Sequence, residues 1–291
     1  MRTRHIRFTL LDAVLIACIL GLLVFVVYRV RITLQYRWNW SFLPTYLTKI
    51  NPDTGRRVPN LLLKGFFTTL RLSVWAIALG SVLGLAAGLF QTGKSLFLRL
   101  LGRAYVELIR NMPPLVLIFL FYFFVSSQIL ASLRIDDALL KTGPGAARAL
   151  SFFFAPPARF SSFISAAVTL ALYEGAYIAE IVRAGIQSVP AGQRQAAYSL
   201  GLSGSQQMTH VILPQAGKTI LPALAGQFIS AIKDSAIVSV ISIPELTFQG
   251  LEIMASTYRI FEIWITILVM YFIMTYACSL LTAGLEKRLR G

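Results

Sequence analysis

The chain has 291 residues, of which 56% are hydrophobic and 13% are charged, and its net charge is +15. Soluble domains carry about 25% charged residues, so this composition excludes an ordinary water-soluble globule and a disordered chain. We therefore expect a membrane protein whose positive excess flanks membrane spans, and not a nucleic-acid-binding protein.

Apolar stretches of spanning length recur along the chain, since a helix needs about 20 residues to cross about 30 Å of hydrocarbon. We expect six spans, at residues 10–28, 61–91, 105–127, 163–183, 224–243 and 261–284. Two segments, 29–60 and 128–160, are too interrupted by Pro, Gly and charge to cross the bilayer. The predicted fold class is an all-α integral membrane protein with about six transmembrane helices.

We expect the first span to be a retained anchor, because the small-residue cleavage pattern of a signal peptide does not follow it. Lys and Arg are almost evenly divided between the two sides of this topology. Charge alone therefore favours cytoplasmic termini only slightly.

Within the second span, Gly80, Gly84 and Gly88 recur at four-residue spacing. This ladder places small residues on one helix face, where another helix can approach closely. We favour packing within the bundle over a subunit interface. The same region contains GLFQTGKS, residues 88–95, which matches a phosphate-binding loop. That motif needs a preceding strand, and here it ends a membrane span, so we reject it.

The residues needed for catalysis or a metal site are scarce. Cys18 and Cys278 lie in apolar runs at opposite ends of the chain, and His5 and His210 are its two histidines. These positions predict neither a disulfide framework, nor a metal centre, nor a nucleophilic triad. We expect a protein that is not an enzyme.

Residues 188–216 are the longest stretch in the second half without a spanning apolar run. Pro190 suits a first helical turn, and Gly201 can end that helix with a left-handed cap. Ser203 with Gln206 predicts a capping box for a second short helix, which we expect to break near Pro214. Two short helices around a glycine turn would form either a docking surface or an ordinary amphipathic linker.

This segment resembles the EAA loop of ABC importer permeases, whose pattern is Glu-Ala-Ala, three residues, Gly, nine residues, then Ile-x-Leu-Pro. The matching positions are Gln195, Ala196, Ala197, Gly201, Val211, Leu213 and Pro214. Gln195 replaces the usual Glu, and Val211 the usual Ile. Runs similar to the polar amino-acid subfamily are 65–73, 105–114, 176–186 and 227–246. The resemblance covers about residues 60–289, and 128–160 is longer than the family core requires.

The resemblance implies a type I permease with a five-helix core and an added amino-terminal helix. Residues 1–60 would be an anchor and extracytoplasmic segment, and 61–291 the permease domain with coupling loop 188–216. A second permease subunit, identical or related, would complete the pore. An ATPase dimer would hold ATP and magnesium, this chain would need no cofactor, and an extracytoplasmic protein would deliver the amino acid. The coupling loop would be cytoplasmic. Both termini would then lie on the cytoplasmic side of the bacterial inner membrane.

Ionisable groups inside apolar spans are costly, and each one invites a functional explanation. The candidate substrate pathway comprises Glu174, Tyr177, Lys233, Asp234, Ser235 and Ser239. Glu174 would meet the α-ammonium or a cationic side chain of an amino acid. It could instead form an ion pair with Lys233, or be a protonated carboxyl that neighbouring hydroxyls satisfy. Ser235, Ser239 and Ser242 would share one face of an α-helix. Lys233 could instead stabilise an interface through Asp234 or Glu180.

Near the start of the third span, Glu107 and Arg110 are spaced for a surface ion pair. Pro113 and Pro114 should bend or restart that helix. The leading hypothesis is a non-catalytic permease subunit that imports a polar amino acid. The alternative is a self-contained secondary carrier or channel driven by an ion gradient, which would transport without any ATPase.

Overall fold

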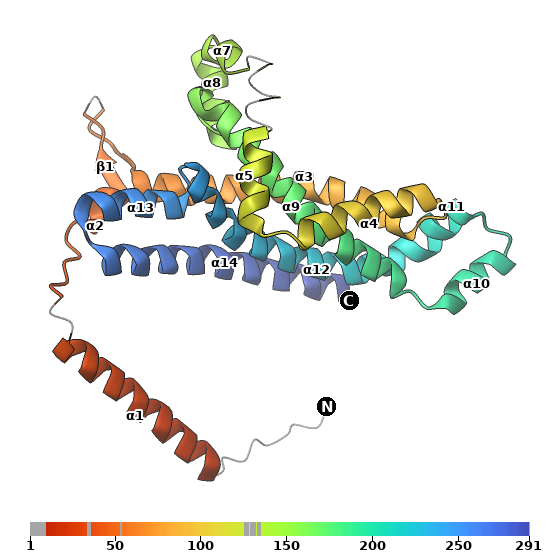
Figure 1. Cartoon of the computed structure of the whole chain (residues 1–291), viewed down its shortest axis with the longest axis horizontal. Helices are drawn as coiled ribbons and strands as arrows, with labels where there is room; N and C mark the ends of the chain where they lie inside the picture. The colour runs from red at the N-terminus through yellow and green to blue at the C-terminus, as the bar shows by residue number, and fades with distance from the viewer. Residues whose placement is uncertain are drawn as a thin grey trace. The chain divides into compact units, whose positions relative to one another are not determined.

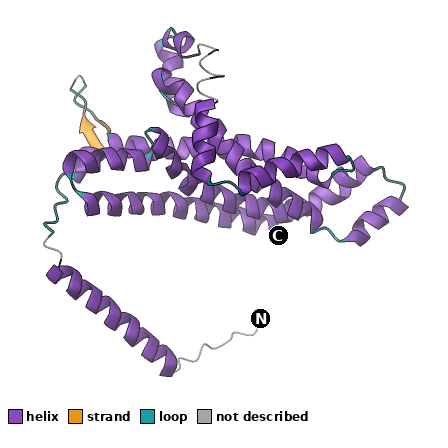
Figure 2. Ribbon diagram, viewed as in Figure 1, coloured by secondary structure: helices purple, strands orange, loops and turns teal. Residues whose placement is uncertain are grey.

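The computed structural model describes residues 10–33, 36–52, 54–124, 128, 132 and 135–290, and these are almost entirely helical (Figures 1 and 2). Residues 1–9 and 125–127, which include the predicted N-terminal inside segment and the end of the third span, lie outside this range. The chain divides into two compact units, Met1–Ser41 and Phe42–Gly291. The first unit holds α1 (Leu10–Thr33), whose Leu10–Arg29 part is long and apolar enough to cross a membrane.

The second unit is a helical bundle with one small hairpin. Its elements are α2 (Leu43–Leu47), β1 (Thr48–Ile50), β2 (Arg57–Pro59), α3 (Leu61–Thr92), α4 (Leu96–Arg110), α5 (Pro114–Phe124), α7 (Ile135–Leu140), α8 (Pro144–Phe153), η2 (Pro157–Arg159), α9 (Phe160–Gln187), α10 (Ala191–Ser199), α11 (Gly204–Gln206), the π-helical η3 (Gln207–Ile212), α12 (Leu213–Asp234), the 3-10 helix η4 (Ser235–Ile241), α13 (Leu246–Thr257) and α14 (Ile260–Arg290).

The predicted spans correspond to helices of spanning length and composition, with one correction. Four of those helices lie at Leu61–Thr92, Pro157–Gln187, Gly204–Ile241 and Ile260–Gly284, in addition to α1. The third predicted span is a pair of helices instead of one straight helix, because the chain bends by 113° between α4 and α5. It also begins at Leu96 and not at Tyr105. Pro113 and Pro114 coincide with the bend, as predicted, since neither residue has a backbone donor.

The glycine ladder of α3 packs against α9 within the same chain. A Cβ added to Gly84 would lie 2.6 Å from the Ile178 side chain, and one added to Gly88 would lie 2.7 Å from that of Val182. Real carbon contacts are longer, so only glycine permits this approach. The preference for packing within the bundle is confirmed, and Gly88 is part of this helix contact and not of a phosphate-binding loop.

The two polar segments fold on the same end of α3. β1 and β2 pair antiparallel, with Lys49 opposite Val58. The C-terminal end of α8 is held to α3 by two donors. Arg71 donates to the carbonyl of Ser151, and Trp75 Nε1 donates to that of Phe153 at 2.9 Å. Among the described residues neither segment crosses the bundle. Because residues 42–60 pack with the second unit, the compact division falls before them, and a functional boundary at residue 60 stays a prediction.

A buried polar cluster joins α3, α13 and α14 beside this end. Glu245, fully buried, accepts hydrogen bonds from the Phe248 amide at 2.7 Å and from the Tyr271 hydroxyl at 2.8 Å. The Thr69 hydroxyl donates to it at 3.3 Å and accepts from the Leu246 amide at 3.1 Å. The Phe248 bond caps α13 itself, whereas Thr69 and Tyr271 belong to α3 and α14, so the cluster fixes the start of α13 on those two helices.

Candidate functional site

The predicted coupling segment forms a short exposed helix at one end of the bundle (Figure 1). Helix α10 ends at Ser199, and Gly201 follows with φ of 76°. The Leu202 amide donates to the Ala197 carbonyl at 3.2 Å, which is the six-residue closure of a glycine-terminated helix. The left-handed cap predicted at Gly201 is confirmed.

The capping box is also confirmed, but the prediction of a second short helix that breaks near Pro214 is wrong. Ser203 and Gln206 exchange both side-chain-to-backbone hydrogen bonds. The helix that starts there continues past Pro214 into α12, so that Gly204–Ile241 is one long helix. The π-helical turn η3 shifts the hydrogen-bond register just before Pro214. This shift accommodates the proline ring, which would otherwise clash in an α-helical turn.

The seven coupling residues occupy two connected elements. Gln195 and Ala196 are exposed on α10, whereas Ala197 is 2% exposed and packs inward. Val211 lies within the π segment, and Leu213 and Pro214 begin α12.

Two exposed apolar side chains flank the Gly201 turn, Tyr198 at 76% and Leu200 at 80% exposure. An apolar tip on an otherwise polar segment is the kind of surface that a partner covers.

Arg194 is a positioning residue that sequence reasoning missed. Its Nη2 donates to the carbonyl of Ile186 at 2.9 Å, near the end of α9. This bond ties α10 to the membrane helix that carries Glu174.

The candidate pathway residues lie on α9 and on the junction of α12 with η4. Glu174 is fully buried, and its Oε2 accepts a hydrogen bond from Gln227 Nε2 at 2.7 Å. Its Oε1 has no hydrogen-bond partner among the described residues. The alternative ion pair with Lys233 is not formed there, since Lys233 is exposed. The sequence analysis missed Gln227 as the partner of Glu174. An amide inside an apolar helix could have identified it, because burying an amide costs free energy unless it is hydrogen-bonded.

The predicted common face of three serines is wrong. Helix α12 changes to the 3-10 helix η4 at Ser235, where three residues complete a turn. Ser235 is buried and donates to the carbonyl of Ile232 at 2.8 Å, while Ser242 is exposed in a left-handed conformation. Ser239, half-buried, thus lies on a different face from Ser235. Asp234, half-buried, is the last residue of α12.

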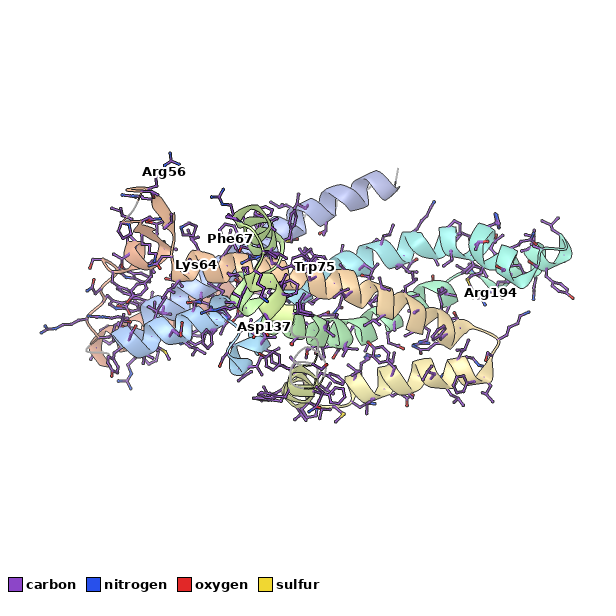
Figure 3. All side chains as sticks on the ribbon, turned by 90° about the horizontal axis from the view of Figure 1, so that it is seen from above. Arg56, Lys64, Phe67, Trp75, Asp137 and Arg194 are labelled. Carbon is purple, nitrogen blue, oxygen red and sulfur yellow. The ribbon has the colours of Figure 1, made fainter. Side chains whose placement is uncertain are left out.

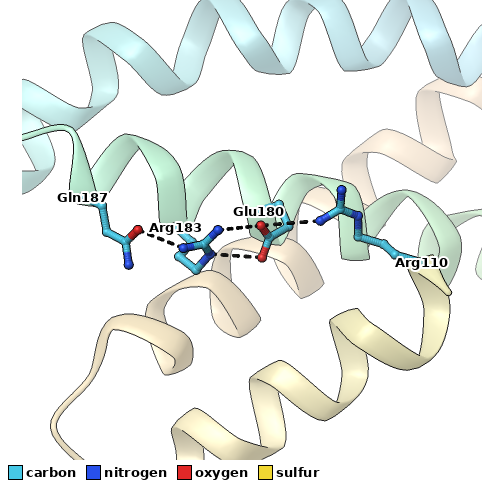
Figure 4. Close-up of polar contacts among 4 residues, drawn as sticks. All are labelled: Arg110, Glu180, Arg183 and Gln187. Carbon is cyan, nitrogen blue, oxygen red and sulfur yellow. Dashed lines mark hydrogen bonds and ion pairs between the residues drawn. The ribbon is translucent and has the colours of Figure 1, made fainter.

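Tyr177 belongs to a second polar cluster, nearer the end of α9. Its ring lies 5.5 Å from the Arg110 guanidinium, and its hydroxyl is 3.2 Å from that of Tyr173. Figure 4 shows Arg110 and Arg183 on either side of Glu180, at 3.4 Å and 2.7 Å from its Oε2. The predicted pair of Glu107 with Arg110 is wrong, because the long Arg110 side chain reaches across to α9.

This cluster lines a polar cavity of about 540 Å³ between α3, α4 and α9. Gln91, which is 7% exposed, also lines this cavity, and its Nε2 has no hydrogen-bond partner among the described residues. Because Glu180 forms ion pairs with Arg110 and Arg183, it is not the partner of Lys233 that the sequence suggested as an alternative. The described residues contain no cluster of His, Cys, Asp and Glu that could hold a metal ion.

Comparisons with known proteins agree with this architecture. A family model described as binding-protein-dependent transport system inner membrane component matches residues 76–291. The chain is 37% identical over 230 residues to the probable glutamine ABC transporter permease protein GlnM of Bacillus subtilis (strain 168), covering 79% of this chain and 94% of that protein. It is 35% identical over 230 residues to the glutamine transport system permease protein GlnP of Escherichia coli (strain K12), covering 79% and 93%.

Solved structures give the same result for the fold. A chain from the crystal structure of an amino acid ABC transporter with histidines aligns with a TM-score of 0.62 at 36% identity, covering 78% of this chain and 94% of that one. An inward-facing structure of the MetNI methionine ABC transporter aligns at 0.59 and 20% identity, which indicates a shared fold. The predicted fold class is confirmed. Since the family model spans more than half of the chain, this protein belongs to the family of binding-protein-dependent transport system inner membrane components.

Proposed function

We propose that this chain is the pore-forming permease subunit of an importer for a polar amino acid of the glutamine class. The proposal is supported by the similarity to two glutamine permeases along more than three quarters of the chain. Family membership disfavours the alternative of a self-contained secondary carrier. The chain itself would hydrolyse nothing, and ATP with magnesium would be held by an ATPase dimer.

The coupling role is carried by one observation, the exposed helix α10 that ends in the left-handed turn at Gly201. Tyr198 and Leu200 would enter a groove on the ATPase, and Arg194 would pass its movement to α9. This arrangement requires the turn to face the cytoplasm, so both chain termini would be cytoplasmic as well. A second permease subunit and an extracytoplasmic binding protein would complete the assembly.

Substrate would pass beside the buried carboxylate of Glu174. Its Oε1 is an acceptor without a partner among the described residues, and Asp234 at the end of α12 is a second acidic group on this path. Acidic groups along the path favour a cation, which suits the α-ammonium of an amino acid. Gln227 would orient Glu174, while Lys233, Ser235, Ser239 and Tyr177 would line other parts of the path.

Transport by reconstituted vesicles tests the proposal. Uptake of radiolabelled glutamine should require the ATPase, ATP and the binding protein together, and gradient-driven uptake by this chain alone would contradict the proposal. Gly201→Val should keep the assembly intact and reduce uptake at least tenfold more than ATPase turnover, because a β-branched residue is strained at positive φ. Gly217→Val is the matched control, since Gly217 also has open space but no positive φ.

The substrate path is tested separately by Glu174→Gln. If the carboxylate meets the ammonium group, the substrate concentration for half-maximal uptake should rise about tenfold, with the basal ATPase rate unchanged. An unaltered concentration dependence would remove Glu174 from the path without affecting the coupling proposal.

A further inference from the structure

A groove of about 760 Å³ runs along the first part of α3, away from both the coupling segment and the polar path. Its floor is α3, one wall is the hairpin at Val58, and the other is the end of α8 at Phe152. The walls thus come from the two polar segments, residues 42–60 and 135–156, which lie outside the coupling segment. Figure 3 shows Lys64, Phe67 and Trp75 following one another along α3 at this place.

The charge pattern of α3 places this groove at a membrane surface. The helix has 32 residues, about 48 Å, whereas the hydrocarbon layer is about 30 Å thick. Residues 72–91 carry no charge and match that thickness, and Lys64 and Arg71 both precede them. The groove therefore extends from the headgroup layer at Lys64 to the edge of the hydrocarbon at Trp75, where tryptophan is typical.

The groove combines an uncompensated positive charge with an apolar floor. Lys64 is exposed, and no ion pair to it occurs among the described residues. Arg71 donates hydrogen bonds to neutral acceptors, which are the carbonyls of Phe67 and Ser151 and the hydroxyl of Thr68. Its charge therefore also has no anionic partner among the described residues.

The apolar side chains that line the groove beside these cations are exposed. Phe67 is 49% exposed, Val74 51%, Phe152 73% and Phe153 59%. Since Arg71 and Trp75 hold the end of α8 in place, the wall that carries Phe152 and Phe153 is fixed and not a free loop. A molecule with an anionic head and an apolar tail matches this pattern of charge and apolar surface.

We propose that the groove binds one anionic phospholipid. The phosphate lies against Lys64 in the field of Arg71, and the first part of an acyl chain lies over Phe67 and Val74 and against Phe152. The acyl chain packs on the apolar floor, while the cations supply selectivity for the charged headgroup. A bound lipid would join the hairpin and α8 across α3.

Native mass spectrometry of the full-length protein tests this site. The probes are phosphatidylglycerol and phosphatidylcholine with identical palmitoyl and oleoyl chains. Wild-type protein should prefer phosphatidylglycerol, and Lys64→Gln should reduce that preference about fivefold, the effect of one cation near a membrane surface. The matched control Lys218→Gln removes an exposed cation on α12 and should leave the preference unchanged. Equal reduction by both variants, or no reduction by Lys64→Gln, would overturn the proposal.

Two further measurements separate a lipid from a protein occupant. Val74→Trp fills the floor and should lower the occupancy of both lipids, and unchanged occupancy would count against an acyl chain in the groove. Photo-crosslinking from Phe67→p-benzoylphenylalanine in native membranes should give an adduct with the mass of a phospholipid. A peptide adduct at this position would show that a helix covers the groove, and the lipid proposal would be wrong.

Discussion

The buried carboxyl of Glu245 makes the stability of this protein depend on pH in a direction opposite to most surface acids. Burial raises the pKa of Glu245 from 4.5 to about 7, although the hydrogen bonds from Thr247, Phe248, Tyr271 and Thr69 act to lower it. A raised folded-state pKa means that the folded protein binds a proton that the unfolded chain has released. The stabilising contribution is therefore complete below pH 4.5 and is lost as the pH rises to about 7.

The size of this effect follows from the shift. A pKa difference of about 2.5 corresponds to roughly 3 kcal/mol, because each unit is worth about 1.36 kcal/mol. Glu245→Gln stays neutral at every pH and keeps one acceptor oxygen, which can take the place of the Oε1 that accepts from the Phe248 amide. The Tyr271 hydroxyl, which donates to Oε2 in the wild type, would instead accept from the new amide group. We expect the variant to lack this loss, so that the free energies of unfolding of the two proteins diverge by about 3 kcal/mol between pH 4.5 and 7.

Denaturation of the detergent-solubilised protein, followed by tryptophan fluorescence across this pH range, measures the divergence. Glu252→Gln is the matched control, because Glu252 is an exposed acid on the same helix, α13. Its pH profile should parallel that of the wild type. Parallel profiles for wild type and Glu245→Gln would refute the reasoning, since the Glu245 carboxyl would then titrate alike in the folded and unfolded states.

Three further substitutions test the packing and the polar contacts. Gly84→Ala should destabilise the bundle by about 1–3 kcal/mol, because its Cβ would lie 2.6 Å from Ile178, and a near-neutral result in thermal unfolding would contradict the close α3–α9 approach. Glu180→Gln removes the negative charge that pairs with Arg110 and Arg183 at a partly exposed site, so a loss above about 1 kcal/mol in chemical denaturation would be unexpected. Arg194→Met should increase amide hydrogen exchange in α10 about tenfold while α9 is unaffected, and equal protection would mean that the bond to Ile186 does not position α10.

Helix α3 connects the features on which these predictions depend. Its glycine face packs on α9, its Thr69 reaches the Glu245 cluster, and its charged end carries the groove at Lys64. One helix therefore supports the bundle, a buried acid and a membrane-surface site on different faces. A helix of 32 residues can do this because it extends beyond the hydrocarbon layer.

The spans and the coupling turn could be predicted from the sequence because each depends on local chemistry. A run of about 20 apolar residues must be helical in lipid, since no water is available to its backbone groups. The left-handed turn at Gly201 and the capping box at Ser203 are equally local, because each involves residues within one turn of the chain. These features did not need knowledge of any distant contact.

The partners of the buried polar groups were decided by the tertiary structure. Glu174 bonds Gln227 and not Lys233, and Arg110 reaches Glu180 and not Glu107, because helix packing brings together residues far apart in the chain. The change from α to 3-10 helix at Ser235 altered which serines share a face, and such changes reflect neighbouring helices more than local propensity. The sequence alone thus determined which segments enter the membrane, while side-chain partners and the groove on α3 depended on how those segments pack.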